Sequence, residues 1–233
     1  MRTNIIITGI PGSGKSTILK KVISEYKNKV GFVTNEVREN GKRIGFEIET
    51  HSGEKSFLAH VDFKSDLKVS KYYVDINNLN DMITKVTEFN SDDLLFLDEI
   101  GQMELFSEKF KDLTTNYLDS PNTCISTLSK VYSEDFTEKI KNRKDIILIE
   151  ITVENRGEKY KYIEALIKKI GKAERYAKEQ DRFTIKNNEA IVRTDHGIKN
   201  LIFQNNEWTC NCDFFQAHNI CSHIIALEEF LKN

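Results

Sequence analysis

With 233 residues, the chain has room for one α/β domain and a small second module. Its apolar stretches all fall well short of the ~20 residues that cross a bilayer, which excludes a membrane-spanning helix. The 34 basic and 36 acidic residues give a formal net charge of −2, so composition does not favour a nucleic-acid binder, although it leaves room for a local basic face. Because the N-terminus enters a strand-like pattern directly, we expect no signal peptide and predict a cytoplasmic protein without membrane contact.

Apolar runs alternate with helix-like stretches as far as residue 170. The runs are NIIITG, LLFLD, TCISTL and DIILIEI, and the stretches that follow them begin at Lys15 or read SEKFKDLTTNYLD, YSEDFTEKIKN and EKYKYIEALIKKI. This alternation predicts an α/β fold with a mostly parallel sheet covered on both faces by helices. Asn40-Gly41 separates two further strand-like runs and predicts a hairpin.

The pattern changes after Gly171, and we predict two domains, residues 1–170 and residues 171–233. KAERYAKEQ predicts a short polar helix, and CSHIIALEEFLK predicts a last helix. Between them, two strand pairs are expected to turn at Asn187-Asn188 and at Asn205-Asn206. The second domain is therefore expected to be a small α+β module.

The segment GIPGSGKST contains the complete G-x(4)-G-K-[ST] pattern of a phosphate-binding loop, with an apolar strand before it and a helical pattern after it. Glycines let successive backbone N–H groups turn towards a phosphate, and the helix N-terminus adds positive potential. We expect Lys15 to reach the β- and γ-phosphates and Ser16 to hold Mg²⁺. The alternative is a glycine-rich turn with a chance lysine, which the agreement of strand, loop and helix disfavours. The residues predicted to bind the nucleotide are Gly9, Ile10, Pro11, Gly12, Ser13, Gly14, Lys15, Ser16, Thr17 and Asp98.

A second carboxylate for Mg²⁺ is expected on a neighbouring strand, and LLFLDEIG supplies Asp98 after four apolar residues. Glu99, beside it, is suited to activate a water for attack on the γ-phosphate. Glu99 and Lys15 are thus the predicted catalytic residues. The alternative is that Asp98 and Glu99 only begin a solvated loop. A GTPase is disfavoured, because no N/T-K-x-D signature follows a strand.

Five segments carry a resemblance to a known family: TGIPGSGKST (8–17), GFVTNEVRENGKRIGFEI (31–48), LAHV (58–61), FLDEIGQMELFSEKF (96–110) and TVENRGE (152–158). They resemble, in order and over about residues 1–170, the small nucleoside-triphosphatases found chiefly in thermophiles and archaea. The resemblance implies a RecA-like P-loop fold and Mg²⁺-dependent hydrolysis of ATP, GTP and other nucleoside triphosphates. By position, Gly12 to Thr17 would hold the phosphates, Asp98 the metal and Glu99 the water. The sequence departs from the family at Ser70, where relatives tend to have glycine.

Three arginines lie in segments that match the family: Arg38, Arg43 and Arg156. Any of them would suit stabilisation of charge on the transferred phosphoryl group, or stacking on the base. Alternatively, Arg38 and Arg43 are surface charges that flank the Asn40-Gly41 turn. The sequence does not separate these possibilities.

The pattern Cys210-x-Cys212-x(8)-Cys221-x-His223 offers four ligands for a closed, tetrahedral and structural Zn²⁺ site. One ion would join the end of a strand pair to the start of the last helix. It would stabilise a segment that is too small to fold stably without it. His218 is a rival ligand, and buried thiols without metal are the alternative to a zinc site. The spacing, with the helix and hairpins before it, resembles the SWIM zinc finger over about residues 172–233. That resemblance implies recruitment to DNA, RNA or a protein partner, and the near-neutral charge favours protein at least as much as nucleic acid.

These observations lead to one principal reading and two others. The principal reading is an Mg²⁺-dependent hydrolase of nucleoside triphosphates with a zinc-stapled recruitment module. The second is a nucleotide-gated adaptor that binds DNA or protein and hydrolyses slowly. A P-loop kinase is less favoured, because the Asp98-Glu99 pair suits water activation and no arginine-rich lid is visible.

Overall fold

The computed structural model describes residues 4–232, which form two compact units that divide between Tyr160 and Lys161. Helix α5 (Arg156–Lys178) continues through this division and through the boundary predicted near residue 170. The larger unit precedes the division and the C-terminal unit follows it. Among the described residues, none of the helices has the length and apolar character that a bilayer crossing requires.

The larger unit is built on one nine-stranded sheet in the order β5-β6-β4-β3-β2-β7-β8-β1-β9. Neighbours from β2 to β9 pair in parallel, whereas β3, β4, β6 and β5 extend the sheet beyond β2 in antiparallel pairs. The predicted α/β fold with a helix-flanked parallel sheet is confirmed, and the extension makes the sheet mixed. The strands are β1 (Asn4–Gly9), β2 (Lys29–Glu39), β3 (Lys42–Thr50), β4 (Lys55–His60), β5 (Lys68–Val69), β6 (Tyr72–Val74), β7 (Leu94–Ile100), β8 (Cys124–Ser129) and β9 (Ile146–Glu150).

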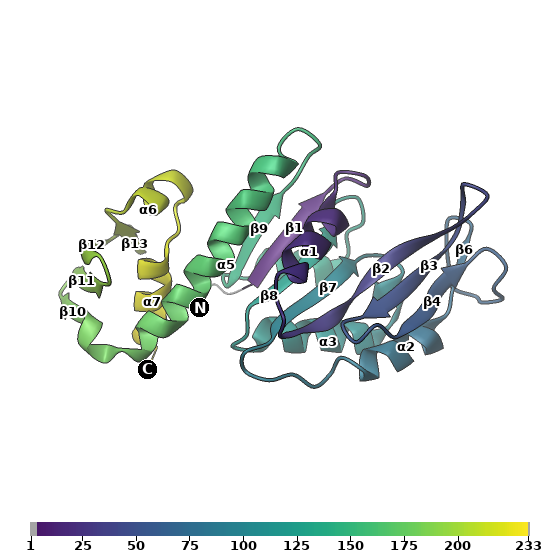
Figure 1. Ribbon diagram of the computed structural model, residues 1–233, viewed down its shortest axis with the longest axis horizontal. Coiled ribbons are helices and arrows are strands. Elements are labelled where there is room, and N and C mark those ends of the chain that lie inside the picture. Colours follow the sequence, from purple (N-terminus) through teal and green to yellow (C-terminus); the bar gives the residue numbers. More distant parts are fainter. Residues whose placement is uncertain (1–3, 233) are drawn as a thin grey trace. The chain divides into compact units, whose positions relative to one another are not determined.

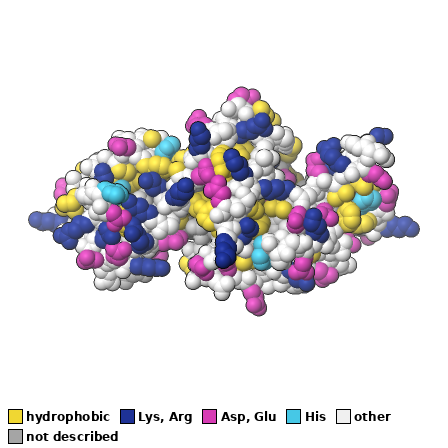
Figure 2. Space-filling view, in the orientation of Figure 1, with side chains coloured by type: hydrophobic (Ala, Val, Ile, Leu, Met, Phe, Trp, Pro, Cys, Tyr) yellow, Lys and Arg dark blue, Asp and Glu magenta, His cyan; other side chains and the backbone are white. Residues whose placement is uncertain are grey.

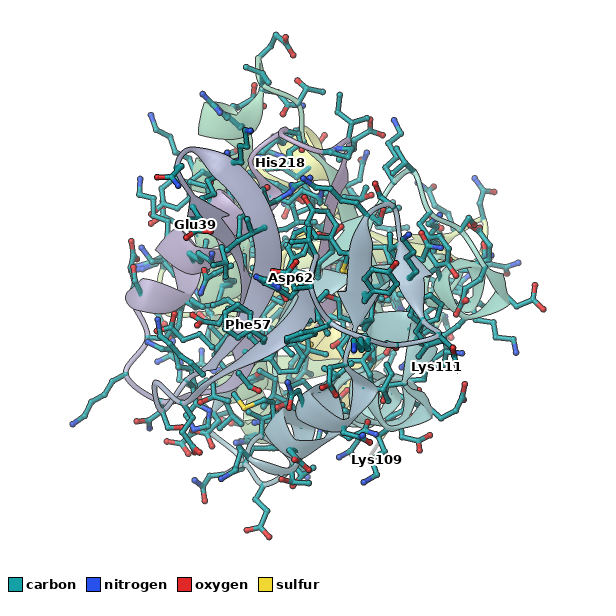
Figure 3. The ribbon with its side chains drawn as sticks, turned by 90° about the vertical axis from the view of Figure 1, so that its right-hand side faces the viewer. Glu39, Phe57, Asp62, Lys109, Lys111 and His218 are labelled. Carbon is teal, nitrogen blue, oxygen red and sulfur yellow. The ribbon has the colours of Figure 1, made fainter. Side chains whose placement is uncertain are left out.

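Helices cover both faces of this sheet (Figure 1). Helix α1 (Lys15–Ser24) contacts β1, β7 and β8 on one face, while α2 (Ile76–Thr84), α3 (Glu108–Asp119) and α4 (Asp135–Lys141) share the core on the other. Helix α3 is amphipathic: Phe110 is fully buried against the sheet, and Figure 3 shows Lys109 on the outer side of the helix. A short 3₁₀ helix, η1 (Glu104–Phe106), precedes α3.

The Asn40-Gly41 hairpin is confirmed, since Arg38 pairs with Arg43 across the turn between β2 and β3. Asn40 and Gly41 have φ values of 50° and 77°, the left-handed conformation that two-residue hairpin turns require. Ser70, where relatives tend to have glycine, lies between β5 and β6 with φ of 56°. The backbone there adopts the conformation that glycine enters most easily.

The described part of the C-terminal unit contains a four-stranded antiparallel sheet, the later part of α5, a short 3₁₀ helix and two further α-helices. The predicted turns are confirmed, with Asn187, Asn205 and Asn206 in the left-handed region. The segment KAERYAK is helical as predicted, but the prediction of a separate short helix is wrong, because α5 passes through Gly171 without a break. Its apolar residues continue at helical spacing on both sides of that glycine, so one buried face supports the whole helix. The further elements are η2 (Gln180–Arg182), β10 (Phe183–Lys186), β11 (Glu189–Thr194), β12 (Gly197–Gln204), β13 (Glu207–Cys210), α6 (Asp213–His218) and α7 (Ser222–Phe230).

Candidate functional site

The glycine-rich loop connects β1 to the N-terminus of α1. Gly14 begins the helix with φ of 100°, and a Cβ on Gly9 would come within 2.5 Å of the Ile151 carbonyl oxygen. Lys15 is buried, and its Nζ donates to the carbonyl oxygens of Gly9 at 3.1 Å and Ile10 at 3.4 Å. The loop therefore holds its cation over the centre of the phosphate-binding turn.

Asp98 lies within β7 and is fully buried. Its Oδ1 accepts hydrogen bonds from Ser16 Oγ at 2.9 Å and from Thr127 Oγ1 at 2.6 Å. Burial raises the pKa of Asp98, while the bonds from Thr127 and Ser16 and the charges of Lys20 and Lys15 oppose that rise. Its Oδ2 is buried without a partner among the described residues. A hydroxyl beside a carboxylate oxygen that lacks a partner is a donor set that suits Mg²⁺.

Two further carboxyl groups, Glu99 and Glu104, line a cleft next to Asp98. Burial raises the pKa of Glu99, the charge of Lys15 lowers it and that of Asp98 raises it. Glu104 is buried, and burial followed by the Glu99 charge holds its pKa well above the usual 4.5. Thr34 Oγ1 donates to the Asp98 carbonyl oxygen at 2.7 Å and lies 3.5 Å from Glu104 Oε1. Burial thus raises the pKa of Glu99 and Glu104, which line the cleft, and of Asp98 beside it.

Sequence reasoning missed Thr34, Thr127 and Glu104. The two threonines interrupt apolar strands, which is a weak signal because threonine is common in strands. Glu104 lies in the segment FLDEIGQMELFSEKF, where its burial was not foreseen. The predicted residues Gly9, Ile10 and Ser13 are not among those that line the cleft: Gly9 and Ile10 accept the hydrogen bonds from Lys15, and Ser13 is buried. The remaining P-loop residues line the cleft with Glu99: Pro11, Gly12, Gly14, Lys15, Ser16 and Thr17.

The cleft has a volume of about 640 Å³ and includes two of the three candidate arginines. Arg43 Nε donates to Tyr72 Oη at 2.9 Å, and its guanidinium forms an ion pair with Glu36. Arg156, in the first turn of α5, lies against the P-loop: its Cδ would be 3.5 Å from a Cβ on Gly14. Arg38 is absent from the cleft lining and instead bonds Glu36 and the carbonyl oxygen of the hairpin turn. Of the three candidate arginines, Arg43 and Arg156 therefore line the cleft and Arg38 does not.

A second candidate site lies within the C-terminal unit. The ligand atoms of Cys210, Cys212, Cys221 and His223 are all buried and lie within 4.8 Å of one another. His218 is not in this group, because its ring packs on Tyr162 and Phe214.

The four ligand atoms fit a single Zn²⁺ ion. Bonds from Cys221, His223 and Cys212 outweigh the effect of burial and lower the pKa of Cys210 to about 4. A hydrogen bond to Cys210 and burial raise the pKa of Cys221. Three thiols and one imidazole within this distance satisfy a closed tetrahedral site, and they leave no position for water or substrate.

Comparisons with known proteins match each of the two regions to a known family. Residues 4–164 match the family model described as NTPase, and residues 188–232 match that of the SWIM zinc finger. A relative named nucleoside-triphosphatase THEP1, from a Thermotoga species, is 44% identical over 155 residues, which are 66% of this chain and 88% of that protein. The human cancer-related nucleoside-triphosphatase is 34% identical over 176 residues, covering 67% of this chain and 92% of that protein.

Solved structures show the same fold in the larger unit. The crystal structure of THEP1 from Aquifex aeolicus matches with a TM-score of 0.62 and 33% identity, covering 70% of this chain and 98% of that one. The solution structure of a human cancer-related nucleoside triphosphatase matches with a TM-score of 0.62 and 31% identity, covering 70% and 96% respectively.

Proposed function

The chain belongs to the P-loop NTPase family over residues 4–164 and hydrolyses nucleoside triphosphates, and we propose that Lys15, Ser16, Asp98 and Glu99 carry out this reaction with Mg²⁺. The observation that carries the proposal is the arrangement around Asp98. Ser16 is hydrogen-bonded to one carboxylate oxygen, the other oxygen is buried without a partner among the described residues, and Glu99 lines the adjacent cleft. When bound, Mg²⁺ would neutralise charge on the β- and γ-phosphates.

The chain's own residues position the reactants. Backbone N–H groups of the P-loop bind the triphosphate, and Lys15 moves its ammonium group from the loop carbonyls to the β- and γ-phosphates. Glu99 orients a water molecule and accepts its proton as the water oxygen bonds to the γ-phosphorus. The bond from that phosphorus to the β–γ bridging oxygen breaks, and the nucleoside diphosphate leaves with the electron pair. Arg43 and Arg156 are candidates to stabilise the charge that develops.

The test is Glu99→Gln, which keeps the size of the side chain and removes its basicity. We expect steady-state phosphate release to fall about 10²- to 10⁴-fold, while the affinity for a fluorescent nucleotide analogue is retained. The matched control is Glu108→Gln on the outer side of α3, which should leave turnover unchanged. Unchanged turnover in Glu99→Gln would contradict the assigned role. A wild-type chain that binds nucleotide but scarcely hydrolyses it would favour the adaptor reading.

For the C-terminal unit we propose recruitment of a macromolecular partner. Its zinc site is closed and so has no catalytic position. We also propose the two-domain organisation of residues 1–170 and 171–233, with the first acting on nucleotide in the cytoplasm and the second recognising the partner.

A further inference from the structure

A second cleft, of about 500 Å³, lies wholly within the C-terminal unit, between α5, the β11–β12 turn and α6. Three lysines line it, Lys169 and Lys172 from α5 and Lys199 from β12, whereas Asp213 is its one carboxylate. This local excess of positive charge is hidden in a composition that is neutral overall. Figure 2 shows Lys and Arg side chains, with histidine among them, gathered on the face of this unit that the view presents.

The cleft lysines differ from two arginines of the same unit. Arg175 and Arg182 both pair with Asp195. By contrast, within residues 4–232 no ion pair joins any of the three cleft lysines to a carboxylate; Lys169 lies 5.1 Å from the Phe214 ring centroid and Lys172 lies over an aromatic ring of α5. Half-buried stems with uncompensated ammonium groups favour an anionic ligand.

An aromatic cluster lies beside these lysines. Phe214 and His218 line the cleft, and their ring centroids are 4.6 Å apart. The Tyr162 ring stacks on Phe214 with an interplanar angle of 19° and lies 4.6 Å from the His218 ring. His218 is exposed, so the cluster offers a ring face to solvent while its other members keep it rigid. Such a surface suits the stacking of a planar base.

We propose that this cleft binds single-stranded nucleic acid, with phosphates on Lys169, Lys172 and Lys199 and a base stacked on the Phe214–His218 surface. Duplex nucleic acid fits less well, because its base faces are covered by stacking within the helix. Two of the three lysines and Tyr162 come from α5, outside the residues 188–232 that match the zinc-finger model. The proposal rests on the recruitment role of the C-terminal unit and is independent of the hydrolytic site.

The experiment measures fluorescence anisotropy of labelled oligo-dT, oligo-U and a mixed-sequence duplex, each of about 16 nucleotides or base pairs. It uses the full zinc-loaded chain between about 50 and 200 mM salt. We expect both single strands to bind more tightly than the duplex. If the natural ligand is RNA, oligo-U alone should do so. The double substitution Lys172→Ala with Lys199→Ala should weaken binding at least about tenfold and lower the salt slope by about 0.7 for each phosphate that the protein no longer neutralises. Phe214→Ala should weaken binding about 5- to 150-fold.

The matched control substitutes Lys168→Ala and Lys178→Ala, exposed lysines of α5 that do not line the cleft, and it should bind as the wild type does. Zinc content, measured on every variant, shows that the unit has kept its fold. The proposal is overturned if the wild type binds no oligonucleotide at low salt, which would point to a protein partner. It is also overturned if the cleft and control variants bind alike, or if the duplex binds as well as the single strands. Phosphate release on the same samples is a separate readout, so a failure of the proposed hydrolytic mechanism would be recognised independently.

Discussion

The phosphate-binding site and the cysteine cluster are both built to receive an ion, but their surroundings differ. Asp98 lies on a strand flanked on both sides by parallel strands, and its side chain is held by hydrogen bonds to Ser16 and Thr127 of the chain itself. The cysteines lie at the ends of short elements: Cys210 ends the four-residue strand β13, and Cys212 precedes the six-residue helix α6. The packing of a large core holds the first site in place, whereas the second site contributes to the stability of the small unit that contains it.

This difference assigns the two metals different physical roles. Mg²⁺ would arrive with the nucleotide at a site that is already formed, so its removal should stop catalysis without unfolding the chain. Zn²⁺ would stabilise a unit that is too small to bury enough apolar surface by itself, so its removal should unfold that unit. The contrast can be tested by substituting residues in each region and measuring both folding and hydrolysis.

The largest effect is expected from Cys221→Ser, which removes one zinc ligand. Structural zinc contributes on the order of 10 kcal/mol to the folding of zinc-finger peptides, so the variant should lose its metal and open the C-terminal unit. Zinc content should fall, and limited trypsin digestion should cleave after Lys186 and Arg193 far faster than in the wild type. Phosphate release should be unchanged, because the residues that carry it all precede Tyr160.

Cys124→Ala is the matched control for the zinc experiment. Cys124 is the fourth cysteine of the chain, is buried in β8 and lies outside the cluster, so its substitution should leave the zinc content intact. If loss of zinc abolished hydrolysis as well, the two sites would not be independent and the comparison would fail.

A smaller effect, with a specific pH dependence, is expected from Glu104→Gln. The folded wild type keeps the proton on Glu104 above pH 4.5, where the unfolded chain releases it. The free energy of unfolding of the wild type therefore falls, relative to the variant, as the pH rises from 4.5 towards the raised pKa of the folded state. The advantage of the variant should grow with a slope of at most about 1.4 kcal/mol per pH unit.

Urea unfolding between pH 4 and pH 8, without Mg²⁺ or nucleotide, measures this difference. Glu108→Gln is the control, because Glu108 is an exposed residue of the adjacent helix and should give a difference that scarcely changes with pH. A difference for Glu104→Gln that is independent of pH would show that the Glu104 carboxyl is not held neutral by burial.

The two regions also differ in how much of them the sequence predicts. The P-loop, the Asp98-Glu99 pair and the hairpin turns are local patterns, so consecutive residues are enough to identify them. Thr127 reaches Asp98 only because β8 lies beside β7 in the sheet, and no spacing in the sequence records that proximity. Helix α2 was missed because Asn-rich INNLNDMIT is a weak helix former, and packing on the antiparallel extension and the Asp75 cap stabilise it.

In the C-terminal unit, the cysteine spacing predicts a metal site but does not distinguish between two histidines. In the fold, His223 at the start of α7 lies beside Cys210, whereas His218 at the end of α6 packs in the aromatic cluster. The basic cleft is also invisible in composition, because its lysines come from α5 and β12, and acidic residues elsewhere cancel their charge in the sum. The basic cleft can be identified only once the fold shows which side chains lie close together.

The smallest effect concerns the two arginines that flank the β2–β3 turn and share Glu36 as a partner. Arg43→Ala should lower kcat/KM about tenfold, or about 1.4 kcal/mol, because Arg43 lines the cleft and its guanidinium is held towards it by Tyr72. Arg38→Ala is the matched variant: it breaks an exposed ion pair with the same glutamate, which costs at most about 1 kcal/mol of stability, and it should leave kcat/KM unchanged. If both variants lowered kcat/KM equally, the arginines would act through Glu36 and the geometry of the hairpin. A loss confined to Arg43→Ala would extend the active site from the parallel half of the sheet into its antiparallel extension.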